Sequence, residues 1–255
     1  MKSIFVITKS TKILLLGIFI IISISVAVAY FYYTSKNNAE DPRIVQSKIM
    51  FQQFDELLKQ SKFAEALPLM DSIEWILDSA PGYRSSFEPG LVYNNRGSAY
   101  LSLALYTSKD SIQKTSLLQK AKWNIDTGII IYKRWIDSHG KMSENEMRQE
   151  ILPFFDANDP AFKDKNYQSI VDKRMEDLML AKKEMSRRLS VSFTNLGIIQ
   201  RHLYQQEDAI NSYVLAIRLW KDNYTARNNL NVLMGKAPED RSIIDQLFPP
   251  EKNKF

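Results

Sequence analysis

Apolar residues recur every three or four positions along most of the chain after residue 43, which is the spacing of an amphipathic helix. The short apolar runs at 91–93 and 129–132 lie inside longer helical patterns, and no convincing pair of strands is found. The pattern therefore predicts an all-α fold. The expected helices cover 43–60, 63–79, 90–106, 110–137, 143–155, 165–203, 206–221 and 224–235.

Several helix boundaries carry a local signal. Gly140 follows an apolar run, as expected at a helix C-terminus. Ser143 and Glu146 have the spacing of a capping box, which predicts a helix beginning there. Asp159 followed by Pro160 is typical of another helix start.

Residues 13–33 contain no charged side chain. At about 1.5 Å per residue this run is about 31 Å long, similar to the hydrocarbon core of a bilayer. It ends in aromatic residues at 30–33, which favour the lipid–water boundary. We predict a transmembrane anchor over 13–33, followed by a linker over 34–42. The alternative is a signal peptide cleaved near Ala29, with a secreted product.

The charges before this run predict which side of the membrane each part occupies. Lys2, Lys9 and Lys12 precede the first acidic residue, Glu40. Because positive charge favours the cytoplasmic side, residues 1–12 are predicted to be cytoplasmic. The remaining chain is then predicted to be extracytoplasmic, in the periplasm of a bacterial envelope.

Composition narrows the function classes. The chain has no cysteine, which excludes disulfides and thiol nucleophiles. The formal net charge is +5, and subtracting the three N-terminal lysines leaves +2 for the rest. No basic stripe with interleaved aromatic residues is present, so nucleic acid is not predicted as a partner.

Gly197 lies in the middle of a predicted helix, where glycine costs about 1 kcal/mol relative to alanine. Two helices that cross closely need small residues at the contact, and burial there offsets this cost. We expect Gly197 to meet Ala209 on the following helix. Tyr213 and Ala216 lie further along the same face of that second helix.

This stretch resembles the tetratricopeptide repeat, a helix–turn–helix unit of 34 residues. Gln200 and Lys221 depart from the family pattern, where tyrosine and proline are expected. The resemblance implies a superhelix of stacked helix pairs. The matching residues are Phe193, Leu196, Gly197, Ala209, Tyr213 and Ala216.

Weaker matches extend the resemblance over 43–134 and 190–235. Gly97 and Ala121 have the small-residue positions of an upstream repeat, with longer helices between them. The segment after Arg227 resembles a degenerate capping helix. Residues 135–189 do not match and are interpreted as an insertion within a TPR-like domain spanning 43–240. A tail follows at 241–255.

Three asparagines occupy the same place in three expected first helices: Asn95, Asn195 and Asn229. In the family that this chain resembles, the first helices line the concave face, and an asparagine there can bond the backbone of an extended peptide. An amide suits that role because it offers both a donor and an acceptor. The three residues are predicted to bind peptide, the alternative being that they merely face solvent.

No residue set predicts catalysis or cofactor binding. His139 and His202 are the only histidines, and neither has carboxylates nearby at metal-ligand spacing. Residues 156–159 resemble the start of a calcium loop, but its glycine and its closing glutamate are missing. We therefore expect no catalytic residue, no metal and no cofactor.

The predicted function is a membrane-anchored TPR-like scaffold or adaptor that holds protein or peptide partners in a membrane-associated assembly. One alternative is an enzyme or ligand-binding protein with an all-helical pocket around 110–190. The other is a structural subunit that assembles with itself.

Overall fold

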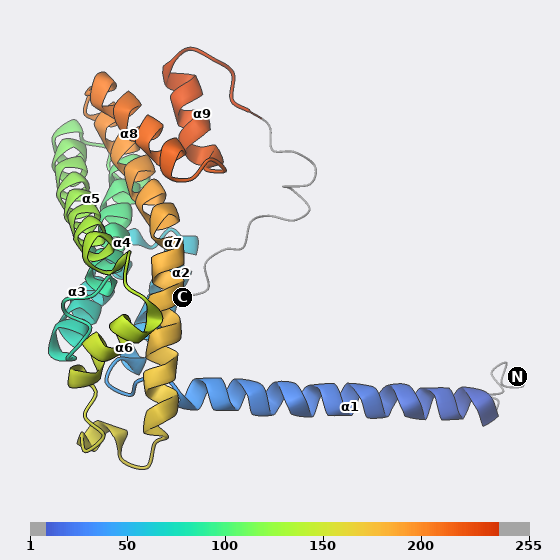
Figure 1. Ribbon diagram of the computed structural model, residues 1–255. Coiled ribbons are helices and arrows are strands. Elements are labelled where there is room, and N and C mark those ends of the chain that lie inside the picture. The colour runs from blue at the N-terminus through green and yellow to red at the C-terminus, as the bar shows by residue number, and fades with distance from the viewer. Residues whose placement is uncertain (1–8, 240–255) are drawn as a thin grey trace, which may run out of the picture.

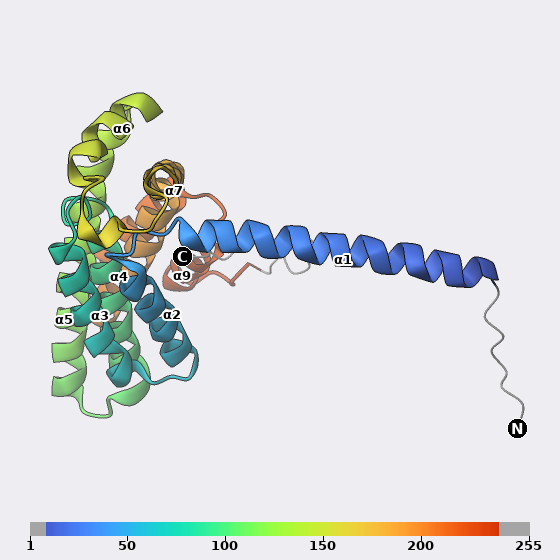
Figure 2. The same cartoon turned by 90° about the horizontal axis from the view of Figure 1, so that it is seen from below.

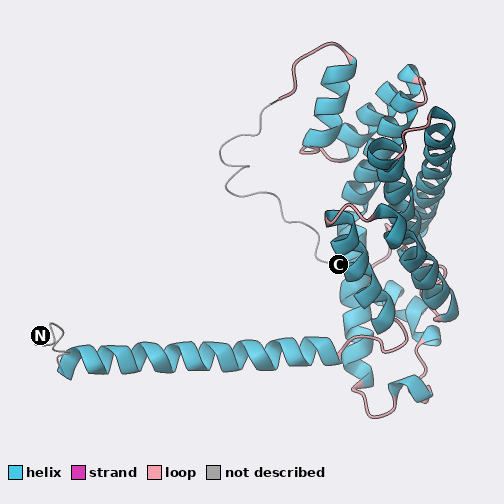
Figure 3. Cartoon of the chain, turned by 180° about the vertical axis from the view of Figure 1, so that it is seen from behind, coloured by secondary structure: helices cyan, strands magenta, loops and turns pink. Residues whose placement is uncertain are grey.

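The computed structural model describes residues 9–239. Within this range the chain forms helices and connecting loops without strands, which confirms the all-α prediction (Figure 3). The predicted tail over 241–255 lies outside the described residues. The α-helices are α1 (Lys9–Asn38), α2 (Val45–Lys59), α3 (Phe63–Ser79), α4 (Glu88–Ser102), α5 (Ser111–His139), α6 (Glu144–Ile151), α7 (Tyr167–His202), α8 (Gln206–Leu219) and α9 (Tyr224–Leu233).

Helix α1 projects away from the body formed by the other helices (Figures 1 and 2). It continues to Asn38, so the first half of the predicted linker over 34–42 is helical. Ala29, the residue of the alternative cleavage prediction, lies within this helix. The chain then turns through residues 39–44 into α2, with Ala39 and Asp41 buried against the body.

The predicted single-pass anchor is corrected. Within the part of the chain that the structure describes, no helix combines the length and the apolar character needed to cross a membrane. The cytoplasmic and periplasmic sides assigned from that anchor were therefore wrong.

The remaining helices pack in chain order. Helix α2 lies against α3, α3 against α4 and α4 against α5. Helix α5 then lies against α7, α7 against α8 and α8 against α9. Helix α3 shows why the pattern predicts this arrangement, since its apolar residues are spaced three or four apart and all face inward. The buried set in α3 is Phe63, Ala66, Met70, Ile73 and Leu77.

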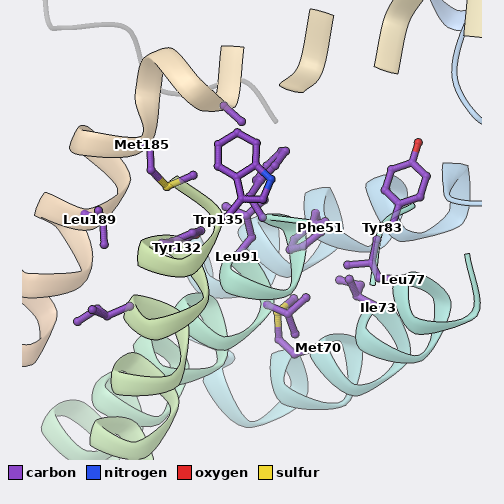
Figure 4. Close-up of a cluster of buried hydrophobic side chains, with 14 of the residues drawn as sticks. Phe51, Met70, Ile73, Leu77, Tyr83, Leu91, Tyr132, Trp135, Met185 and Leu189 are labelled. Carbon is purple, nitrogen blue, oxygen red and sulfur yellow. The ribbon is translucent and has the colours of Figure 1, made fainter. Parts of the chain in front are cut away.

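One hydrophobic core runs through the body. Figure 4 shows Phe51 of α2, Met70 of α3, Leu91 of α4, Trp135 of α5 and Met185 of α7 gathered into one cluster. Because α7 contributes to this cluster, the segment predicted as an insertion is part of the core.

The region 135–189 closes the lower end of the body in Figure 1. Ser143 and Glu146 form the predicted capping box at the start of α6. Asp159 caps only a short 3₁₀ turn, Pro160–Phe162, and the next α-helix begins later, after the N-cap Asn166. The helix start indicated by Asp159 and Pro160 is thus a 3₁₀ turn, and the α-helix expected over 165–203 begins at Tyr167.

Helices α2, α7 and α9 end in the same turn. A residue with positive φ follows each helix: Ser61, Tyr204 and Gly235. In each case the next backbone N–H donates to a carbonyl five residues earlier, as in a Schellman motif. Helices α3 and α8 begin two residues after Ser61 and Tyr204, respectively.

Candidate functional site

The α4/α5 pair makes the close contact that its small residues predict. A Cβ on Gly97 would lie 2.7 Å from Cδ1 of Ile125 and 3.1 Å from the carbonyl oxygen of Ala121. Seven residues earlier on α4, a Cβ on Gly90 would lie 2.5 Å from Cε1 of Tyr132, which is seven residues after Ile125. The two helices are therefore antiparallel and in contact over two turns.

The α7/α8 pair is similar, with one difference from the prediction. A Cβ on Gly197 would lie 2.5 Å from Cε1 of Tyr213, so the nearest side chain is the tyrosine ring and not the methyl of Ala209. The reason is that a ring reaches across the crossing, whereas a methyl group does not. Ala209 and Ala216 are fully buried on the same face of α8, and Phe193 and Leu196 are buried on α7.

The three asparagines predicted to bind peptide have different surroundings. Asn195 donates from Nδ2 to Oγ of Ser98 at 3.0 Å, so it joins α7 to α4. Asn229 donates to the carbonyl oxygen of Thr225, four residues earlier in its own helix, at 2.8 Å. Asn95 is partly buried on α4.

A second bond supports the same α4–α7 contact. Ser192 donates to Oδ1 of Asn94 at 2.8 Å, and Ser98 donates to the carbonyl oxygen of Asn94 at 3.0 Å. Asn195 therefore belongs to a polar contact between helices. Its amide bonds within the fold because α7 lies beside α4.

A pocket of about 240 Å³ opens between α2, the start of α4 and α7. It combines an apolar lining with charged residues. The apolar side chains come from four segments of the chain: Ile44, Phe51, Leu77, Phe87, Leu91 and Leu180. The charged residues are Glu40, Lys48, Glu88, Lys173, Asp177 and Arg188.

Ion pairs form one side of this pocket. Lys48 pairs with Glu40 and lies 3.3 Å from Oδ2 of Asp177, while Lys173 pairs with Asp177 and lies 3.9 Å from Glu40. Burial lowers the pKa of Lys48, but the two carboxylates raise it more, so its pKa is above the usual value. The lysine therefore stays charged at neutral pH.

A buried ion pair, Arg174 with Glu88, lies next to the pocket, and Glu88 is part of its lining. The Arg174 guanidinium bonds Glu88 and donates to Oγ of Ser86 at 2.9 Å and to the carbonyl oxygen of Gly82 at 3.1 Å. It also lies 4.1 Å from the ring centre of Tyr83. Burial lowers the pKa of Arg174, but Glu88, Tyr83 and Asp177 together raise it more, so its pKa lies above the usual value.

The charges that line the pocket balance, with three cations and three anions. Arg188, near the apolar floor, lies 5.3 Å from the ring centre of Phe87 and bonds the hydroxyl of Tyr132. An apolar group with polar surroundings fits such a site better than a strongly charged ligand.

This pocket differs from the one considered at 110–190. Its α7 wall, from Lys173 to Arg188, lies in that range, but its other walls come from residues 40–91. Sequence reasoning missed it because its walls are far apart in the chain. The only local signal was the spacing of Lys173 and Asp177, which suits an ion pair on one helix.

The two histidines, His139 and His202, lie among neighbouring side chains of the fold. Nε2 of His139 lies 3.0 Å from Oε1 of Glu150, and its ring stacks on Trp135. Burial lowers the pKa of His202, and Lys114 and Arg201 lower it further. Over residues 9–239, no group of three or more acidic or histidine side chains is placed to hold a metal ion.

Comparison of the chain with protein-family models, with curated proteins and with solved structures finds no match. The class that the structure itself defines is an all-helical protein whose helices pack in chain order, with a small pocket between α2, α4 and α7.

Proposed function

We propose that this protein is a non-catalytic adaptor with a TPR-like array, which binds a segment of a partner protein. The two clearest helix pairs support the repeat. Four residues separate Ala121 from Ile125, the side chain against Gly97, and four separate Ala209 from Tyr213, the side chain against Gly197. A shared contact at a shared spacing is what a repeated unit requires.

The observation that carries the binding function is the pocket between α2, α4 and α7. These three helices hold the first-helix position in their pairs, so the pocket lies where an array of this kind binds partners. Its volume of about 240 Å³ is below the range of roughly 300–1,000 Å³ that is usual for small-molecule sites. It suits one bulky apolar side chain of a partner, with the ion pairs forming a polar rim.

The test uses two leucine or isoleucine positions of similar exposure. Leu180 at the pocket mouth is 47% exposed, and Ile130 on α5, away from the pocket, is 56% exposed. A random peptide library is selected on the wild-type protein, and the selected peptides are then measured against Leu180→Glu and Ile130→Glu. We expect peptides with a bulky apolar residue to lose at least about tenfold in affinity, roughly 1.4 kcal/mol, only for Leu180→Glu.

Two results would contradict the proposal. Peptides that bind both variants equally would place binding away from the pocket. Turnover or tight small-molecule binding that Leu180→Glu abolishes would favour the enzyme or ligand-binding alternative.

Self-assembly is a second candidate because two tryptophans, one on α3 and one on α5, are exposed. Trp75 on α3 is 72% exposed and Trp123 on α5 is 61% exposed. The hollows beside them both include Asp71, so the two rings border one surface. Sedimentation of the wild-type protein and of Trp75→Ser tests this: a wild-type oligomer that the substitution dissociates would support assembly through this surface.

A further inference from the structure

Helix α9 ends like α2 and α7, but the chain beyond it takes a different course. After Ser61 and Tyr204 the chain begins a new helix within two residues. After Gly235 the chain forms no helix through residues 236–239. Instead of a following helix, α9 is contacted by this non-helical segment, which we call the strap (residues 236–239).

Asn228 bonds the backbone of this strap through both ends of its amide. The backbone N–H of Glu239 donates to Oδ1 of Asn228 at 2.7 Å. Nδ2 of Asn228 donates to the carbonyl oxygen of Glu239 at 3.2 Å. This pair of hydrogen bonds recognises one extended residue whatever its side chain. It is the role predicted for Asn229, performed by the residue before it.

Two neighbours recognise the side chain of the same residue. Nε of Arg227 lies 3.2 Å from Oε2 of Glu239, and Nδ2 of Asn231 donates to Oε1 at 3.4 Å. The guanidinium is held against the ring of Tyr224, 4.3 Å from its centre. Arg227, Asn228 and Asn231 form what we call the α9 face, which binds one residue by its backbone and by its carboxylate.

We propose that the α9 face is a binding site for an extended acidic segment of a partner protein, and that the strap occupies it in cis until such a segment displaces it. The contacts require only an extended backbone and a carboxylate, and both chains can supply these. The α9 face is separate from the pocket between α2, α4 and α7, so this proposal does not depend on what the pocket binds.

The contacts also make displacement feasible. The side chain of Glu239 is 46% exposed, and a half-exposed ion pair is weak. The strap holds the site mainly because it is tethered to α9 by Gly235 and Lys236, which gives it a high local concentration. A partner segment therefore needs only to outcompete the strap's weak contacts and its high local concentration.

The test uses the full-length chain and a fluorescent synthetic peptide with the sequence of residues 235–242. Glu239→Pro removes both the N–H that bonds Asn228 and the carboxylate, which frees the α9 face. If the strap occupies the site for about nine-tenths of the time, freeing it lowers the apparent Kd of the added peptide about tenfold. We expect Glu239→Pro to bind the peptide about tenfold more tightly than wild type.

Controls identify the site. Adding Asn228→Ala to Glu239→Pro should reverse the gain, whereas adding Asn229→Ala should leave it unchanged, because Asn229 bonds only its own helix. A peptide with glutamine in place of its glutamate should bind more weakly. The proposal is overturned if Glu239→Pro binds no better than wild type, or if Asn228→Ala has no effect in that background while thermal unfolding shows an intact fold.

Discussion

The α4/α5 and α7/α8 pairs each place a tyrosine ring against a bare glycine backbone, yet different chemistry holds the two pairs together. In both, a Cβ on the glycine would lie 2.5 Å from the ring, at Gly90 against Tyr132 and at Gly197 against Tyr213. Along α4/α5 the close approach continues at Gly97 and at Gly128. The backbones of α4 and α5 approach closely because these glycines have no side chain.

Along α7/α8, beyond Gly197, hydroxyl and amide groups form hydrogen bonds between the two helices. Ser190 donates to the carbonyl oxygen of Ala216 at 2.6 Å. Ser212 donates to Oε1 of Gln200 at 2.7 Å, so the residue that departs from the repeat pattern has a bonding role. Small polar side chains allow two helices to approach if each buried polar atom finds a partner. The comparison teaches that one contact distance can arise from two kinds of sequence.

The largest expected effect comes from filling the α7/α8 crossing. Gly197→Leu should destabilise the fold by about 3 kcal/mol or more, because the new side chain meets the buried Tyr213 ring. Gly17 is the matched control, a helical glycine with no atom within 4 Å of its Cβ position. Thermal melting should show a large loss for Gly197→Leu and almost none for Gly17→Leu; equal losses would remove the crossing as the cause.

Removing the polar contacts between α7 and the start of α9 should lower the free energy of unfolding somewhat less. Asn223 donates from Nδ2 to Ser190 and to Thr194, both at 2.8 Å, and its Oδ1 caps α9 at the N–H of Ala226. Asn223→Ala should therefore cost about 2 kcal/mol in urea unfolding. Asn229→Ala should change stability by a few tenths of a kcal/mol, since surface substitutions usually stay within about 0.5 kcal/mol. A small effect of Asn223→Ala would mean that its contacts with the Ser190 and Thr194 hydroxyl groups do not hold α9 to α7.

The two tyrosines should respond differently to loss of the hydroxyl group. Tyr132 bonds Arg188, so Tyr132→Phe should cost about 1–2 kcal/mol by leaving a buried donor without its partner. The hydroxyl of Tyr213 is buried without a hydrogen-bond partner among the described residues. Tyr213→Phe should thus be neutral or slightly stabilising. Chemical unfolding of both variants checks this, and equal losses would show that the two crossings are alike.

The last expected effect is confined to alkaline pH. Burial raises the pKa of Tyr213 to about 12, while Arg201 lowers it slightly. The usual pKa in an unfolded chain is about 10. The stability from keeping this tyrosine neutral is therefore complete below about pH 10 and is lost as pH rises from about 10 to about 12. Melting temperatures between these limits should fall less steeply for Tyr213→Phe than for wild type, and parallel curves would contradict this.

Much of the fold could be predicted because its signals are local. The periodic burial of α3 and the capping box of α6 depend on residues within a few positions of each other. The small residues Gly97 and Gly197 correctly indicated two close crossings. The sequence analysis expected Gly197 to contact Ala209, because two small residues allow their helices to approach closely. The side chain that fills the space beside Gly197 is the ring of Tyr213, which extends further from its own helix than a methyl group does.

The candidate sites could not be predicted in the same way. The pocket joins Lys48 of α2 to Asp177 of α7, which are far apart in the chain. Asn228 and Asn229 are identical neighbours with different bonds, because only one of them faces the strap. A single sequence does not indicate which side of a helix meets an extended segment.

The amino-acid sequence by itself determined that this protein is helical and where its helices pair closely, because periodicity, caps and missing side chains act over a few residues. Only the tertiary structure decided that α7 lies beside α4, that a pocket opens between them and α2, and that a strap covers α9. Those features depend on contacts between distant segments, and their free energy depends on side-chain reach and on partners that local sequence does not specify.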